Sequence, residues 1–145
     1  MMELFNNQIY KRGFANTMIE NDTFCKIFID TDEQYEYLYH LIKKLVNGND
    51  ETRRDIKNET LDLSLIKNDD FDAIQRLDFP DGFLHSRYYF EVEPNRNVEF
   101  QRYIMSISLF LESLWSSGLN AVAACDFEEL LPRKGGYNYV GECRS

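Results

Sequence analysis

The stretch TFCKIFIDTDEQYEYLYHLIKKLVNG, residues 23–48, decides the fold of this chain. Its first eight residues alternate between apolar and polar, with Cys25, Ile27 and Ile29 on one face. Alternation with a period of two is typical of a strand that buries one side. The sequence therefore predicts a half-buried strand over residues 23–30, followed directly by a helix.

The helix carries start and stop signals at both ends. Thr31 and Gln34 form a capping-box pattern, Lys43 and Lys44 lie in the last turn, and Gly48 follows the end. These placements satisfy free backbone groups and suit the helix dipole. A helix capped by Thr31 and ending before Gly48 is predicted, with an apolar stripe formed by Tyr35, Leu38, Ile42 and Leu45.

Downstream, the hydrophobic pattern predicts two further strands. Residues 49–58 are polar and are expected to form a loop, and residues 60–66 alternate again, with their leucines on one face. An acidic run over residues 68–82 then leads to a third alternating segment, residues 83–93. A loop, a strand, an acidic connection and a second strand are therefore expected in that order.

The last third of the chain predicts a long helix and a short strand. Asn95 or Asn97 is expected to cap a helix that runs to about Ser117 and is closed by Gly118. Its apolar residues keep a helical period around a wide arc, so this helix is expected to be nearly buried. Residues 119–127 are small and apolar and predict the final strand.

The element order is strand, helix, strand, strand, helix, strand. This order predicts an α+β fold, a ferredoxin-like split βαβ sandwich (βαββαβ) with an antiparallel sheet and two helices on one face. The last strand would lie antiparallel beside the first, which brings Cys25 close to Cys125, and both are expected to stay thiols. Residues 1–145 are expected to form a single domain, with residues 1–22 as a peripheral segment of undefined structure.

Composition narrows the class of protein. The 145 residues (17.2 kDa) carry a formal net charge of −9 and are 43% hydrophobic, which suits one acidic domain with a real core. We find no apolar run of membrane-spanning length and no signal-peptide core. The 3 cysteines are an odd number and none lies in a C-x-x-C pair. We therefore expect a cytoplasmic protein without membrane insertion, structural disulfides or metal.

Acidic residues are concentrated in one part of the chain. Residues 59–93 hold nine acids and three bases, which is two thirds of the net charge. The register of a calcium-binding EF-hand loop is absent from this run. It is either a solvated loop or an acidic surface for a basic partner. The residues predicted to bind such a partner are Asp69, Asp70, Phe71, Asp72, Asp78, Phe79 and Asp81.

Catalysis and nucleic-acid binding are both disfavoured. Asp126, Glu128 and Glu129 could be read as an acid and base pair, but no nucleophile, metal or cofactor motif accompanies them. They are expected to be surface or capping groups. The sheet face that would carry Phe28 and Tyr89 also carries several acids, which repel phosphate. We expect no enzyme activity, no catalytic residues, no cofactor and no nucleic-acid partner.

The C-terminal third resembles a known family. A helix containing Trp115 precedes ACDFEELLPRKGGY, residues 124–137. This pattern is similar to that of bacterial immunity proteins encoded beside polymorphic toxins, including contact-dependent growth inhibition systems. The resemblance covers roughly residues 98–139. It implies a structural role for the motif, with Trp115 in the core and Pro132 and Gly135-Gly136 shaping a turn.

The resemblance also implies a function. Such proteins bind and neutralise a cognate toxin, and many of these toxins are basic nucleases. An acidic inhibitor gains fast association with a basic cleft. We therefore expect a cytoplasmic immunity protein that binds its toxin one to one through the acidic run. The alternative is a small-ligand-binding or regulatory ferredoxin-like domain that acts as a homodimer.

Overall fold

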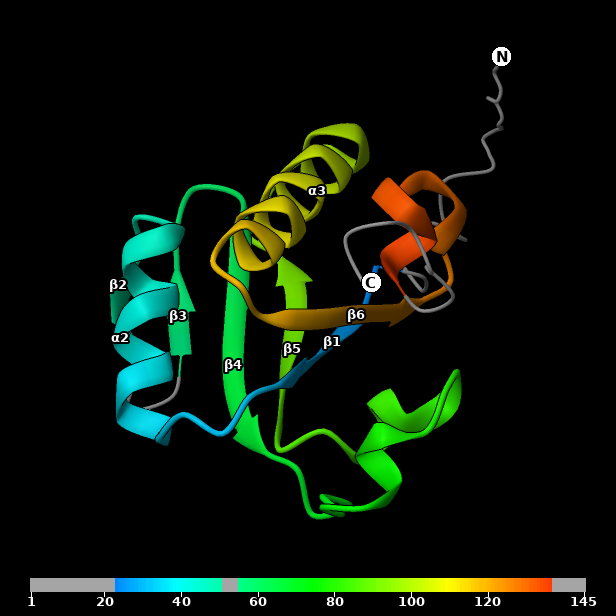
Figure 1. Ribbon diagram of the computed structural model, residues 1–145. Helices are drawn as coiled ribbons and strands as arrows, with labels where there is room; N and C mark the ends of the chain where they lie inside the picture. Colours follow the sequence, from blue (N-terminus) through cyan, green and yellow to red (C-terminus); the bar gives the residue numbers. More distant parts are fainter. Residues whose placement is uncertain (1–22, 51–54, 137–145) are drawn as a thin grey trace.

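A computed structural model describes residues 23–50 and 55–136 of the chain (Figure 1). Residues 1–22, for which the sequence predicted a peripheral segment, lie outside the described residues. The described chain contains a six-stranded sheet of order β2-β3-β4-β5-β1-β6, in which every neighbouring pair is antiparallel. The strands are β1 (Cys25–Asp30), β2 (Asn49–Asp50), β3 (Asp55–Lys57), β4 (Leu61–Lys67), β5 (Tyr88–Pro94) and β6 (Asn120–Cys125).

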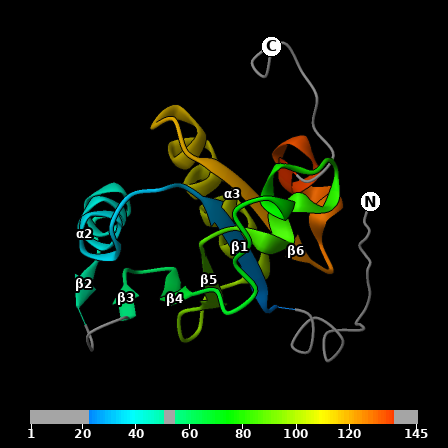
Figure 2. The same cartoon turned by 60° about the horizontal axis from the view of Figure 1, so that its bottom comes forward.

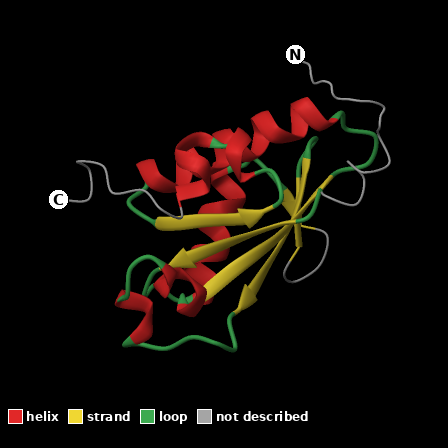
Figure 3. Ribbon diagram, turned by 90° about the vertical axis from the view of Figure 1, so that its right-hand side faces the viewer, coloured by secondary structure: helices red, strands yellow, loops and turns green. Residues whose placement is uncertain are grey.

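Two helices, α2 (Tyr35–Leu45) and α3 (Phe100–Ser116), cover one face of this sheet (Figure 2). Figure 3 shows the strands gathered beneath them. Side chains at alternate strand positions meet the buried stripes of both helices, so that one core joins the two layers. The α+β class, the antiparallel sheet and the strand faces predicted from alternation are confirmed. The largest fully buried side chains include Ile27, Leu38, Ile42, Leu63, Phe90, Tyr103 and Ile107.

The number of strands was predicted wrongly. Four were expected, but the segment expected to be a loop, residues 49–58, contributes β2 and β3, which pair with each other and extend the sheet beyond β4. β3 has three residues, of which only Ile56 is apolar and buried. Alternation cannot be recognised in so short a strand, because it contains a single inward position.

Both helices begin later than predicted. The residue before α2 is Gln34, and no side chain caps it, because Thr31 Oγ1 instead accepts a hydrogen bond from Glu33 N at 3.2 Å. Helix α3 begins after Glu99, and Asn97 adopts a positive φ of 66° that is incompatible with the extended cap position. The expected C-terminal stop of α3 is confirmed, since Gly118 takes a φ of 85°.

Strand β5 also begins later than predicted. The alternating pattern started at residue 83, but residues 81–85 form a short 3-10 turn, η2 (Asp81–His85). A second such turn, η1 (Gln75–Leu77), precedes it. The segment joining β4 to β5 therefore spans residues 68–87 and is called here the β4–β5 connection.

Strands β1 and β6 lie side by side, as predicted. In their antiparallel register, Cys25 is the direct partner of Cys125. Both cysteines are free thiols, Cys25 buried and Cys125 partly exposed. Strand β6 forms one edge of the sheet, followed by two further short turns, η3 (Glu128–Leu130) and η4 (Pro132–Gly136).

Candidate functional site

The β4–β5 connection is anchored by one buried polar side chain, Asn68. Its Nδ2 donates to the carbonyl oxygens of Leu84 and Ser86, at 3.1 and 2.8 Å. Its Oδ1 accepts a hydrogen bond from the backbone N–H of Asp70 at 3.0 Å. The two ends of the connection are thereby tied together, because a single amide side chain satisfies backbone groups from both.

Asp72 shapes the middle of the connection. Its Oδ1 accepts hydrogen bonds from the backbone N–H groups of Ile74 and Gln75, at 2.9 and 2.8 Å. These bonds favour the ionised carboxylate and hold the pKa of Asp72 below its usual range. Asp72 was predicted to bind a partner, but its carboxylate already serves the turn that begins η1, so it acts here as a structural group.

Both arginines of the connection point back at the body of the protein. Arg76 Nη1 lies 2.8 Å from Asp32 Oδ1 and 3.4 Å from Asp30 Oδ1, and Arg87 Nη2 lies 3.2 Å from Asp32 Oδ1. The two guanidinium groups lower the pKa of Asp32, whereas burial raises the pKa of Asp30. Both arginines of the connection are therefore neutralised by Asp30 and Asp32, on the side of the connection that faces the body of the protein.

Phe71 lies beneath these arginines. It was predicted to be an apolar anchor for a partner, but it is half-buried, with the guanidinium carbons of Arg87 and Arg76 at 4.2 and 5.4 Å from its ring centre. Such cation–π packing holds the ring against the protein. Its role is to support the connection, and the sequence could not reveal this because the arginines approach from positions 76 and 87.

The outer surface of the connection combines acids with apolar side chains. Four of the five predicted aspartates are exposed: Asp69, Asp70, Asp78 and Asp81. Phe79, also predicted, is 56% exposed. Three exposed apolar residues that the sequence reasoning missed accompany it: Ile74 (77%), Leu77 (75%) and Leu84 (44%). The sequence did hold a signal for their exposure: they lie in an acidic run and follow neither the helical nor the alternating period of a buried face. These eight residues are called here the acidic–apolar surface.

The inner side of the connection covers part of the sheet face that the helices leave open. Phe28 of β1 is 5% exposed, and the ring of Phe83 packs edge-on against it at 5.3 Å. Lys26 lies 4.2 Å above the ring of Tyr89 on the same face. The sequence indicated that residues 1–22 or a partner chain would cover this face; residues 1–22 lie outside the described residues, and near β1 the face is covered by Phe83 of η2. The connection is thus packed on the sheet as well as hydrogen-bonded at its ends.

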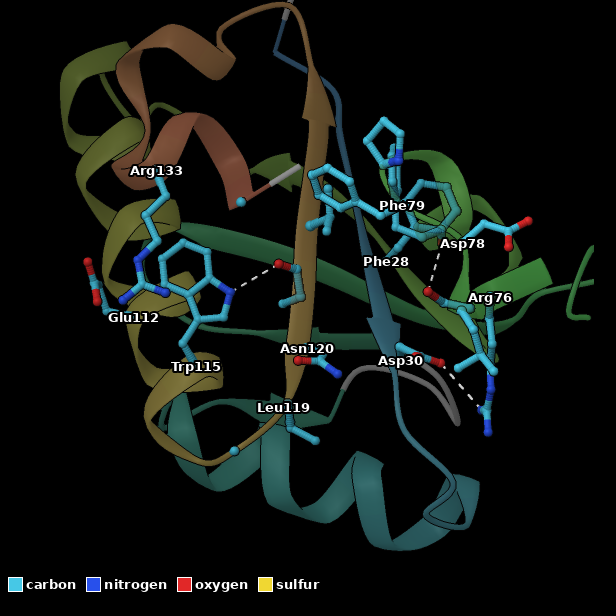
Figure 4. A pocket seen from close by; sticks show the side chains of 18 of the residues that line it. Phe28, Asp30, Arg76, Asp78, Phe79, Glu112, Trp115, Leu119, Asn120 and Arg133 are labelled. Atoms are coloured by element: carbon cyan, nitrogen blue, oxygen red, sulfur yellow. Dashed lines mark hydrogen bonds and ion pairs between the residues drawn. The ribbon is translucent and has the colours of Figure 1, made fainter. Parts of the chain in front are cut away.

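A cleft of about 720 Å³ opens beside the connection, along the first half of β6 (Figure 4). Figure 4 shows Trp115 on one side of β6 and Phe28, Phe79 and Arg76 on the other. The indole Nε1–H of Trp115 donates to the Ala121 carbonyl at 3.0 Å. Trp115 is half-buried at the edge of the core, whereas the resemblance implied a place inside it. The cleft has both charged and aromatic walls.

The acidic residues after β6 have structural roles. Glu128 Oε2 accepts a hydrogen bond from the backbone N–H of Cys125 at 3.1 Å, and Glu129 lies 3.9 Å from Lys134. This matches the expected capping and surface roles. Within residues 23–50 and 55–136, we find no group of three or more metal-ligating side chains arranged around one point. No helix in these same ranges combines the length and apolar character that a membrane crossing requires.

Comparison with known proteins identifies no relative. The chain matches no protein-family model, and neither a curated protein sequence nor a solved structure is significantly similar to it. The assignment of function therefore depends on the residues and geometry described above.

Proposed function

We propose that this protein is a cytoplasmic immunity protein that binds one copy of a cognate bacterial toxin and neutralises it through the acidic–apolar surface. The observation that carries this proposal is the composition of that surface. Four exposed aspartates and four exposed large apolar side chains lie on one anchored segment. Exposed apolar side chains close to charged ones are typical of a protein-binding site.

Charge supports a basic partner. The arginines of the connection are paired with Asp30 and Asp32, so they offset little of the negative charge that the aspartates present outward. A net acidic surface accelerates encounter with a basic cleft, such as the substrate site of a nuclease. The apolar side chains would then supply the contacts that slow dissociation.

Anchoring supports a binding role as well. The connection is held by Asn68 at its ends, by Asp72 in its first turn and by Phe83 against the sheet. A segment that is ordered before binding loses less conformational entropy when a partner docks. An inhibitor needs such a preorganised surface, and it needs no chemistry of its own.

We also propose that the fold is ferredoxin-like at its centre. The order β4-β5-β1-β6 with α2 and α3 on one face is consistent with two split βαβ units, to which β2 and β3 add an outer hairpin. This part of the proposal concerns architecture only, because such folds serve many unrelated functions.

The first experiment is to express the full chain together with the product of the gene immediately upstream. We expect a 1:1 complex on size exclusion and a partner that is lethal when expressed alone. If no complex forms and the chain elutes as a homodimer, the immunity proposal is wrong.

Charge variants then test the surface. Changing Asp69, Asp70, Asp78 and Asp81 together to Asn should slow association at least about tenfold and weaken its dependence on salt. Asp72 stays unchanged because it holds the turn. The matched control changes four exposed acids outside the connection to their amides: Glu36, Glu59, Glu99 and Asp126. Equal slowing in both variants would show that overall charge, and not this surface, steers the partner.

Apolar variants test the contact itself. Phe79→Ala should raise the dissociation constant by about 30-fold, as expected for a buried aromatic anchor. Leu109→Ala on α3 is the control, because Leu109 is 61% exposed and equally apolar but lies outside the acidic–apolar surface. An unchanged dissociation constant for Phe79→Ala and Leu77→Ala together would contradict the proposed interface.

The cleft supports a second candidate function, the binding of a small ligand by a homodimeric regulatory domain. Its volume of about 720 Å³ lies within the range of small-molecule sites, and Trp115 and Phe79 could stack on a planar ligand. A metabolite that raises the melting temperature of the wild-type chain, but not that of Trp115→Leu, would favour this candidate.

A further inference from the structure

The two thiols that join the first and last strands are placed for covalent bonding. Cys25 is the first residue of β1 and Cys125 is the last residue of β6, and they face each other directly although they lie a hundred positions apart. Directly opposed residues in an antiparallel pair have Cα atoms about 4.5 or 5.5 Å apart, depending on the type of pair. Both values fall within the Cα separation of about 4.4–6.8 Å that disulfides span.

The type of pair can be identified from one hydrogen bond. The backbone N–H of Cys125 donates to Glu128 Oε2, so it points away from β1. The two cysteines therefore form the pair without mutual backbone bonds, in which side chains lie closest. Their Cβ atoms are expected about 4.5–5.5 Å apart, so an approach of about 1 Å would reach disulfide geometry. Cys25 begins β1 and Cys125 ends β6, so the pair lies at the end of the two-strand ladder, where the backbone can move more easily than in its middle.

The surroundings give the two thiols different roles. Cys25 is fully buried, and its hydrogen bond with Cys125, followed by burial, raises its pKa. The same hydrogen bond and the backbone N–H of Phe127 lower the pKa of Cys125, which is the partly exposed thiol. Of the two cysteines, the partly exposed one is thus the one whose thiol favours the thiolate, which is the nucleophilic form. The buried thiol of Cys25 already contacts the Cys125 thiol through this hydrogen bond.

We propose that Cys25 and Cys125 are a redox-modification site that forms a reversible intramolecular disulfide when the protein meets a peroxide. Cys125 Sγ attacks one oxygen of the peroxide, which breaks the O–O bond, releases hydroxide and leaves Cys125 as a sulfenic acid. Cys25 Sγ then attacks Cys125 Sγ, its proton leaves with the displaced hydroxide as water, and the S–S bond forms. The proton lost by the Cys125 thiol converts the first released hydroxide to water, so two thiols lose two electrons in total and one molecule of hydrogen peroxide becomes two waters.

The bond would fasten β6 to β1 at the end of the sheet that leads into η3. It closes a loop of about a hundred residues, which restricts the unfolded chain and stabilises the folded one. We expect the melting temperature to rise by about 10 °C. This inference does not depend on the proposed function, because the site lies outside the acidic–apolar surface.

The test uses the full chain carrying Cys143→Ser, so that the two strand cysteines are the only thiols. After treatment with hydrogen peroxide, we expect a monomer that has lost both thiols and a cross-linked pair of peptides containing Cys25 and Cys125. Dithiothreitol should restore both thiols and the lower melting temperature. Covalent dimers, sulfinic acid on Cys125 without cross-link, or two unreacted thiols would each overturn the proposal.

Two controls separate the pair from a single reactive cysteine. Cys25→Ala in the same background should leave Cys125 to stop at the sulfenic acid, which a dimedone probe traps. The wild-type chain, in which no substitution can disturb folding, should give the same cross-linked peptides. Cross-linking of Cys143 to either strand cysteine in the wild type would contradict the assignment of this pair.

Discussion

Arg76 Nη1 lies 2.8 Å from Asp32 Oδ1, although 44 positions separate the two residues in the sequence. Arg87 binds the same carboxylate oxygen at 3.2 Å. One carboxylate between β1 and α2 therefore receives an arginine from the middle of the β4–β5 connection and another from its end. The position of the acidic–apolar surface relative to the sheet depends on this shared contact.

Replacing Arg76 with alanine should loosen the connection. Asp32 would keep Arg87, but Asp30 would lose its nearest cation, and its raised pKa should rise further. Amide hydrogens of residues 74–82 should exchange about tenfold faster, while those of β1 and β5 are unaffected. Hydrogen exchange and NMR titration of the Asp30 carboxyl measure both effects. Arg102→Ala, which breaks the exposed pair with Glu59, is the control and should change neither.

Asn68→Ala should be the most destabilising change within the connection. It leaves the carbonyl groups of Leu84 and Ser86 without their donor and the N–H of Asp70 without its acceptor. Buried backbone groups without partners cost about 1–3 kcal/mol, so we expect a loss of about 2–3 kcal/mol in the free energy of unfolding. Urea unfolding measures this loss. A loss below about 0.5 kcal/mol would mean that the connection holds itself without Asn68.

The contribution of Asp72 should depend on pH. Its pKa is lowered in the folded protein, so its ionised form adds stability at pH values above the ordinary carboxyl pKa of about 3.9. This stability is lost as the pH falls through the lowered folded value. Wild type should therefore exceed Asp72→Asn in stability near neutral pH, and the two should converge in acid. A difference that stays constant from about pH 7 to pH 2 would contradict this assignment.

Gly135→Ala should destabilise the protein more than Gly118→Ala, although the two glycines have almost the same φ, 86° and 85°. A β-carbon at Gly135 would lie 2.7 Å from the Ala123 carbonyl oxygen, whereas nothing lies within 4 Å at Gly118. We expect losses of about 2–4 and about 1 kcal/mol, respectively. Thermal or urea unfolding checks the order, and equal losses would show that steric contact with β6 contributes nothing.

The fold could be predicted from sequence where apolar side chains alternate over enough residues. The leucines of β4 and the Cys25, Ile27, Ile29 face of β1 were sufficient to place both strands, and their packing against the helices follows from the same pattern. Strand β3 could not be predicted, because Ile56 is its one inward apolar residue. The start of α2 was misplaced because Thr31, a favourable cap, bonds locally to Glu33 instead.

The candidate site was predictable in its charge and not in its detail. Asp69, Asp70, Asp78 and Asp81 are exposed, as an acidic run suggests. Which residues face inward depends on contacts between residues far apart in the sequence, such as Arg87 against Phe71. The local sequence pattern cannot predict such contacts. The exposure of Leu77 could not be predicted either, because leucine is usually buried and its exposure here depends on how the whole connection packs.

The two edges of the described sheet bear on aggregation. At one edge, Gly135 and Gly136 lie against the carbonyl groups of Ala123 and Ala121, and Trp115 occupies the latter with its indole N–H. At the other edge, β2 has only two residues. Long open edges recruit strands from other chains and seed insoluble assemblies. With both edges of the described sheet blunted in this way, the sheet offers little template for strand addition from another chain.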